Sequence, residues 1–173
     1  MASQSAADLI KAYLEDAIAA EKNFETQLRA FAKEGNDTTA QAMFEKHANE
    51  TRSQYERLTG RLEALGGGAS GFKTALAHML GMMPKTAQIG HEETERVTQN
   101  LIMAYTVEHA EVAMYEALAS IASAAGDTVT AQLARSIQQE ERQTAELVWK
   151  QIPLSAIRPL STVSGEERVR RAG

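Results

Sequence analysis

The sequence predicts an all-α protein that folds as an antiparallel four-helix bundle. The 173-residue chain has prolines only at Pro84, Pro153 and Pro159, and residues that favour helices dominate the rest. Four segments carry apolar residues at spacings of three and four, which is the pattern of a helix with one buried face. The segments are separated by two short breaks and one long connection. These observations together indicate the bundle.

The first two helices are predicted to form a tight hairpin. The apolar stripe of the first spans residues 10–31 and ends at the Gly-Asn pair 35–36. Asp37 follows at once and is placed to cap the second helix. The stripe of that helix spans residues 43–65 and stops at the three glycines 66–68. Because the break is short, the two helices should be antiparallel neighbours.

The long connection separates the two hairpins. Residues 66–90 are rich in glycine, methionine and small residues, with one short apolar helix predicted at 72–83 and ended by Pro84. The third helix should begin near Glu92 and end near Ala125. Two short turns with one long crossover between them define a ferritin-like four-helix bundle.

The fourth helix closes the second hairpin. Gly126 and Asp127 repeat the stop and cap signals of the first hairpin, and an apolar stripe follows. The pattern fails after Ile152. We therefore predict a bundle domain over residues 1–152 and a flexible C-terminal tail over residues 153–173.

The two hairpins also share a repeat with an offset of 90 residues. Glu21 and Glu50 are 29 positions apart, as are Glu111 and Glu140. Each lies on the apolar stripe of its helix, where an uncompensated charge is costly. Ferritin-like bundles compensate such glutamates by binding two iron or manganese ions. The predicted metal ligands are therefore these four residues together with Glu108, one turn before Glu111.

Composition limits the ligands and the partners. The chain has no cysteine, so a metal must be held by oxygen or by histidine nitrogen. A net charge of −5 argues against nucleic-acid binding. No stretch approaches the roughly 18 apolar residues of a membrane span, and the N-terminus lacks a signal pattern. We expect a cytoplasmic protein with no membrane partner.

The sequence resembles the YciE/YciF-type family of bacterial ferritin-like stress proteins from about Leu9 to Ile152. One motif in each helix carries the resemblance: Ala20-Glu21-Lys22, then Phe44-Glu45-Lys46-His47 with Glu50-Thr51 and Gln54, then Val107-Glu108-His109-Ala110-Glu111 with Tyr115, and Glu140-Glu141. The resemblance implies a four-helix bundle that forms a homodimer, a di-metal site and a stress-associated role.

The chain departs from better-understood relatives because no histidine follows the ligand glutamates of the second and fourth helices. Gln54 and Thr144 stand there, and both are weaker ligands than imidazole. The repeat favours Glu140 over Glu141, although the stripe accommodates either. The residues that remain as further metal ligands or as supports of the ligands are His47, Gln54, His109, Tyr115, Glu141 and Thr144.

Two functions are compatible with this pattern. The first is a stress-related protein that handles oxidants at two iron or manganese ions, by peroxide chemistry or by ferrous-ion oxidation. The second is a non-enzymatic structural or stress-interaction protein with weak or no metal binding, which the missing histidines favour. In that case Arg52 and Arg142 could pair with the glutamates and form a metal-free polar layer.

Overall fold

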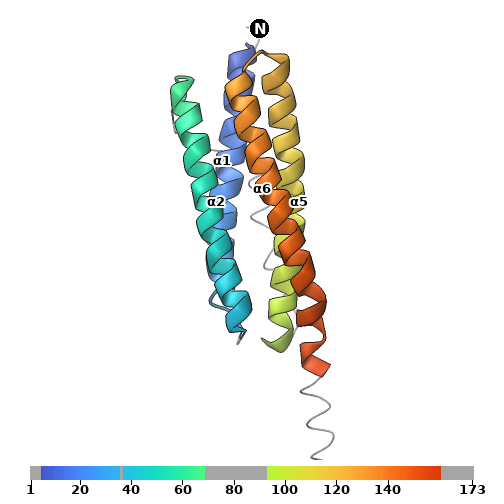
Figure 1. Cartoon of the computed structure of the whole chain (residues 1–173). Coiled ribbons are helices and arrows are strands. Elements are labelled where there is room, and N and C mark those ends of the chain that lie inside the picture. Colours follow the sequence, from blue (N-terminus) through green and yellow to red (C-terminus); the bar gives the residue numbers. More distant parts are fainter. Residues whose placement is uncertain (1–4, 36, 69–92, 161–173) are drawn as a thin grey trace, which may run out of the picture.

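The structure is an all-α bundle of four helices, which confirms the predicted fold class (Figure 1). It is a computed structural model and describes residues 5–35, 37–68 and 93–160. The helices are α1 (Ala6–Phe31), α2 (Thr38–Ala64), α5 (Glu93–Ala124) and α6 (Thr128–Ala156). No strand occurs within the described ranges. The short helix predicted at 72–83 lies outside them.

The helices form two antiparallel hairpins that pack against each other. α1 pairs with α2, α5 pairs with α6, and the hairpins meet through α1 against α5 and α2 against α6. The contact between α2 and α6 is the smallest of these four. In Figure 1, α2 and α5 run in the same direction, so α2 ends at the opposite end of the bundle from the start of α5. This is the helix order that a long crossover produces.

The hairpin turns follow the helix-end signals in the sequence. Asp37 caps α2 by accepting hydrogen bonds from backbone N–H groups of its first turn. Asp127 caps α6 by accepting from the Thr130 N–H at 3.0 Å. α5 ends at Ala124. In the turn that follows, Gly126 has a φ of +79°, which suits glycine, and the N–H of the next residue donates to the Ala122 carbonyl. These short turns make each hairpin a compact antiparallel pair.

The core between the hairpins is apolar along most of its length. Its largest fully buried apolar side chains come from all four helices: Leu14, Ile18, Phe24, Leu28, Phe44, Leu58, Leu101, Leu118 and Ile137. Burial of each stabilises the fold by about 1.5–3 kcal/mol relative to exposure. Polar side chains that interrupt such a core therefore need compensation. None of the described helices is long and apolar enough to cross a membrane.

α6 continues past the predicted end of the bundle at Ile152 and reaches Ala156. Ser155 is buried and shares a hydrogen bond of 2.8 Å with Thr98 of α5. Beyond the helix, Arg158 forms an ion pair with the N-cap residue of α2. These contacts are polar, so the apolar pattern gave no sign of them. The rest of the predicted tail lies outside the described ranges.

Candidate metal centre

Halfway along the bundle, a group of buried polar side chains interrupts the apolar core. We call it the central cluster, and it consists of Glu21 on α1, His47 on α2, Glu108 and Glu111 on α5, and Glu141 on α6. Each residue is at most 3% exposed. Ionisable side chains are rarely buried so completely unless they are paired or bind metal. All four helices therefore deliver an ionisable group to one place.

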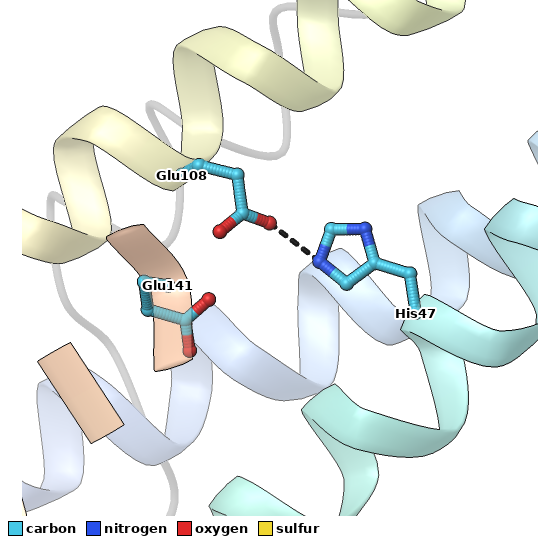
Figure 2. Close-up of side chains that lie close together, drawn as sticks. All are labelled: His47, Glu108 and Glu141. Carbon is cyan, nitrogen blue, oxygen red and sulfur yellow. Dashed lines mark ion pairs between the residues drawn. The ribbon is translucent and has the colours of Figure 1, made fainter. Parts of the chain in front are cut away.

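Three members of the central cluster point toward one another (Figure 2). His47 Nε2 lies 2.5 Å from Glu108 Oε1, although the two groups are not aligned as a hydrogen bond. One ligand atom each from His47, Glu108 and Glu141 can be chosen so that all three lie within 4.8 Å of one another. A single cation could contact an imidazole nitrogen and two carboxylate oxygens at this spacing.

The other side of the cluster is formed by Glu21 and Glu111. The hydroxyl of Tyr115, which is fully buried on α5, donates a hydrogen bond to Glu21 Oε1. This leaves Glu21 Oε2 without a hydrogen-bond partner, and both oxygens of Glu111 are also unpartnered. Tyr115 therefore fixes the orientation of one carboxylate while its second oxygen stays available.

The unpartnered atoms of the cluster fit a metal site. Buried atoms without a hydrogen bond include both ring nitrogens of His47, both oxygens of Glu108 and one oxygen of Glu141. Buried polar atoms are nearly always hydrogen-bonded, so a concentration of unbonded ones requires an explanation. Four carboxylates carry the charge that two divalent cations neutralise, and oxygen with imidazole is a suitable donor set for iron or manganese. The residues present therefore fit the predicted ions.

The electrostatics show how costly the charges are without a cation. Burial raises the pKa of Glu21, Glu111 and Glu141 well above the ordinary value, and the charges of neighbouring glutamates raise it further. Burial raises the pKa of Glu108 to about 8, against a smaller lowering by its contact with Glu141. Burial also lowers the pKa of His47 to about 4, so its ring is neutral and able to act as a ligand.

Two predicted ligands lie at the edge of the cluster. The Glu50 side chain is 43% exposed and pairs with Lys46 at 2.5 Å, one helical turn from His47. The Glu140 side chain is 40% exposed and pairs with Arg57. Of the two adjacent glutamates on α6, it is Glu141 that the structure buries in the cluster.

The remaining candidates have different surroundings. Gln54 is buried beside the cluster, with its Oε1 unpartnered and its Nε2 3.4 Å from Glu140 Oε2. The Thr144 hydroxyl bonds the backbone carbonyl of Glu140 within its own helix. His109 is exposed on the outer face of α5, where its ring packs on Tyr105. His109 therefore points away from the cluster.

The arginine that pairs with Glu140 is Arg57, which the sequence patterns did not identify. Arg57 donates to both oxygens of Glu140, at 3.0 and 2.5 Å, across the contact between α2 and α6. Arg52 is exposed and pairs with Glu56 on its own helix, and Arg142 is exposed. Arg57 lies one turn after Gln54 on the same helix face, and this spacing was the available signal that it also reaches α6.

Comparison with known proteins agrees with the fold. The family described as "Domain of unknown function (DUF892)" matches residues 5–156. A solved structure from Xanthomonas campestris is 28% identical with a TM-score of 0.76, and the match covers 92% of this chain and 99% of that one. The matched region contains all four helices and every residue of the central cluster.

Two further structures share the bundle. The Escherichia coli stress protein YciF is 23% identical with a TM-score of 0.80, covering 90% of this chain and 99% of that one. Dps from Staphylococcus aureus is 20% identical with a TM-score of 0.69, covering 84% of this chain and 95% of that one. At these identities the likeness concerns the fold alone, and it confirms the ferritin-like arrangement of the helices.

Proposed function

Since this chain belongs to the DUF892 family, whose structural relatives include E. coli YciF, we propose that it is a ferritin-like di-metal protein that handles oxidants. It binds two iron or manganese ions in the central cluster. The observation that carries the proposal is the set of unpartnered, fully buried carboxylate and imidazole atoms supplied by all four helices. The description of the E. coli relative as a stress protein supports the stress-related part.

The ligands in this proposal are Glu21, His47, Glu108, Glu111 and Glu141. Compared with the sequence-based set, Glu141 takes the place of Glu140 because only Glu141 is buried among the other members. Glu50 is one turn from His47, and its charge acts on Glu108 and His47. We therefore keep Glu50 as an additional ligand at the rim of the cluster.

The side chains around the ions would control access and protons. Iron or manganese, when bound, supplies one-electron redox chemistry suited to peroxide reduction or ferrous-ion oxidation. Tyr115 holds Glu21 through its hydroxyl, and the Phe24 ring packs edge-on against His47 at 5.2 Å and keeps water from it. Glu108, with a pKa of about 8 in the metal-free protein, holds a proton near neutral pH that it must release when a cation binds.

Neighbouring glutamates on α6 provide the test of this site. Metal-free wild type, Glu141→Gln and Glu140→Gln are titrated with Mn(II), and both the number of ions bound and the melting temperature are measured. We expect two ions per chain in the wild type and in Glu140→Gln, with a rise in melting temperature because only the folded state binds. Glu141→Gln should lose at least one ion. An equal response of both variants would overturn this ligand assignment.

The second candidate function would follow from a different result of the same titration. If the wild type binds no ion and Mn(II) or Fe(II) leaves its melting temperature unchanged, the di-metal proposal fails. The fold would then serve a non-enzymatic structural or stress-interaction role. The absence of a histidine on α6 at the level of the cluster is the feature of this chain that favours this alternative.

We also propose that the chain forms a homodimer through the outer face of α5 and α6. Ile102 is 43% exposed and Trp149 is 58% exposed, and the ring of Tyr105 packs on Trp149 at 5.1 Å. A pocket of about 350 Å³ opens beside these rings, with His109 and Val112 also in its wall. Exposed aromatic and aliphatic side chains beside a pocket are typical of contact surfaces.

A further inference from the structure

The contact between α2 and α6, which we call the α2–α6 seam, carries half-exposed side chains next to the buried central cluster. It is smaller than the contacts of α5 with α6, of α1 with α2 and of α1 with α5. Arg57 of α2 and Glu140 of α6 close it with a bidentate pair, at 3.0 and 2.5 Å. The two side chains are 36% and 40% exposed. The pair therefore lies at the boundary between water and the buried carboxylates.

Arg57 is connected to the cluster on its inner side. Gln54, which is buried, donates to the same Glu140 carboxylate at 3.4 Å. The charge of Arg57 also acts on the cluster itself: burial raises the pKa of Glu21, and Arg57 opposes that rise. Conversely, the charge of Glu141 acts on Arg57. Its guanidinium thus lies within electrostatic range of two cluster carboxylates without bonding either.

The hydrogen bonds of Arg57 are incomplete. Its two terminal nitrogens hold Glu140, whereas its Nε is buried and has no hydrogen-bond partner. If Arg57 served only to bridge the two helices, its buried Nε would be expected to donate a hydrogen bond. Arg57 is instead held by one half-exposed carboxylate, next to a group of buried carboxyls.

We infer that Arg57 is the counter-cation of the metal-free cluster and guards the α2–α6 seam through which cations enter. This inference rests on the proposed function. In the metal-free protein, the positive charge of Arg57 lies within electrostatic range of the Glu21 and Glu141 carboxyls and stabilises their ionised forms. When divalent cations occupy the cluster, the same charge repels them. Arg57 therefore stabilises the metal-free state and weakens metal binding, and Glu140 is the first carboxylate that an entering cation meets.

The test compares three arginine variants of the full chain. Arg57→Gln removes the charge, Arg57→Lys keeps the charge without the bidentate fork, and Arg52→Gln is a matched control on the exposed face of the same helix. For each, the Mn(II) dissociation constant is measured by the electron paramagnetic resonance of free Mn(II). The melting temperature of the metal-free protein is measured in parallel.

The inference predicts opposite effects on the two quantities. Arg57→Gln should bind Mn(II) about tenfold more tightly, since a nearby positive charge is removed, and should melt at a lower temperature without metal. Arg57→Lys and Arg52→Gln should keep the wild-type affinity within a factor of two to three. If Arg57→Gln binds Mn(II) as the wild type does or more weakly, the inference is overturned and the di-metal function stands. Wild-type protein that binds no Mn(II) would overturn both.

Discussion

At the scale of single residues, the carboxyls of the central cluster hold protons that a bound cation would displace. Glu21, Glu108, Glu111 and Glu141 are buried, and their pKa values are raised chiefly by that burial. Without metal, the folded protein therefore holds protons on carboxyls that the unfolded chain has already released. Metal binding must displace these protons, so affinity for the ions should increase as the pH rises.

The metal-free protein should lose stability between pH 6.5 and pH 8. In this window the folded state binds more protons than the unfolded state, because the pKa of Glu108 is about 8 against 4.5 for an unperturbed glutamate. Each such carboxyl lowers the free energy of unfolding by about 1.4 kcal/mol per pH unit. The lowered pKa of His47 acts only below pH 6.5, where it favours stability at higher pH. Urea unfolding of metal-free protein at several pH values measures the slope.

The control for this slope is the double variant Glu108→Gln/Glu141→Gln. It removes two of the raised pKa values while keeping the size of the side chains, so its stability should depend less on pH over the same window. A wild-type profile that is flat or rises from pH 6.5 to pH 8 would contradict the assignment of protonated carboxyls to the folded state.

The adjacent residues Glu140 and Glu141 show how far the sequence could locate the site. The 90-residue repeat pointed to Glu140, but the buried stripe of α6 runs through Ala134, Ile137 and Ala145, and Glu141 falls on it. Alanine is a weak signal of burial in a sequence, since it is equally common on exposed helix faces. Buried carboxylates on α1, α5 and α6 could be predicted, whereas the choice between Glu140 and Glu141 depended on helix rotation, and α2 buries His47 while the predicted Glu50 stays half-exposed.

At the scale of helices, the two hairpins are tied together at one end by Arg61 and Asp127. Arg61 is in the last turn of α2, and its guanidinium pairs with the Asp127 carboxylate at 2.7 Å and with the Thr130 hydroxyl at 2.7 Å. Asp127 is also the N-cap of α6. The Asp127 carboxylate therefore caps α6 and also binds Arg61 of the other hairpin.

Replacement of Asp127 with alanine should destabilise the bundle by about 2–3 kcal/mol. Loss of the N-cap alone costs about 1 kcal/mol, and the half-buried Arg61 would lose its ion partner in addition. The melting temperature should decrease by about 5 °C or more. Thr128→Ala, at the exposed neighbouring position, serves as the control and should change stability by less than about 0.5 kcal/mol. A similarly small effect of Asp127→Ala would contradict the tie.

The helix ends that could be predicted were those with a local chemical signal. Gly126 and Asp127 marked the second turn correctly because a positive φ and an N-cap each favour particular residue types. The end of α6 carried no such signal. In its last turn, Ser155 shares a hydrogen bond with Thr98, which is 57 residues away in the chain, and no local pattern reports such a contact.

At the scale of the whole molecule, the outer face of α5 and α6 should form the homodimer contact. Sedimentation velocity should show a dimer for the wild type and a shift to monomer for Ile102→Glu, because a charge would be buried in the contact. Val129→Glu alters another exposed apolar residue of α6, and it should stay dimeric. The fluorescence of Trp149, the single tryptophan, should shift to longer wavelength as the dimer dissociates. An unchanged dimer in Ile102→Glu would place the contact elsewhere.

The bundle as a whole brings side chains of four separate helices to one buried cluster, and its helical architecture could be predicted from the sequence. The pairing of Arg57 with Glu140 could not, because it joins residues 83 positions apart across the α2–α6 seam. That pairing holds Glu140 at the half-exposed rim, whereas its neighbour Glu141 is buried.

The metal content of the purified protein tests the central claim most directly. The wild type and the Glu21→Ala/Glu141→Ala variant are expressed in medium supplemented with iron and manganese, and metal per chain is measured by mass spectrometry. We expect about two ions per chain in the wild type, one for each pair of buried carboxylates, and a loss of both in the variant. Substoichiometric metal that is the same in both proteins would contradict the claim that the central cluster is a di-metal site.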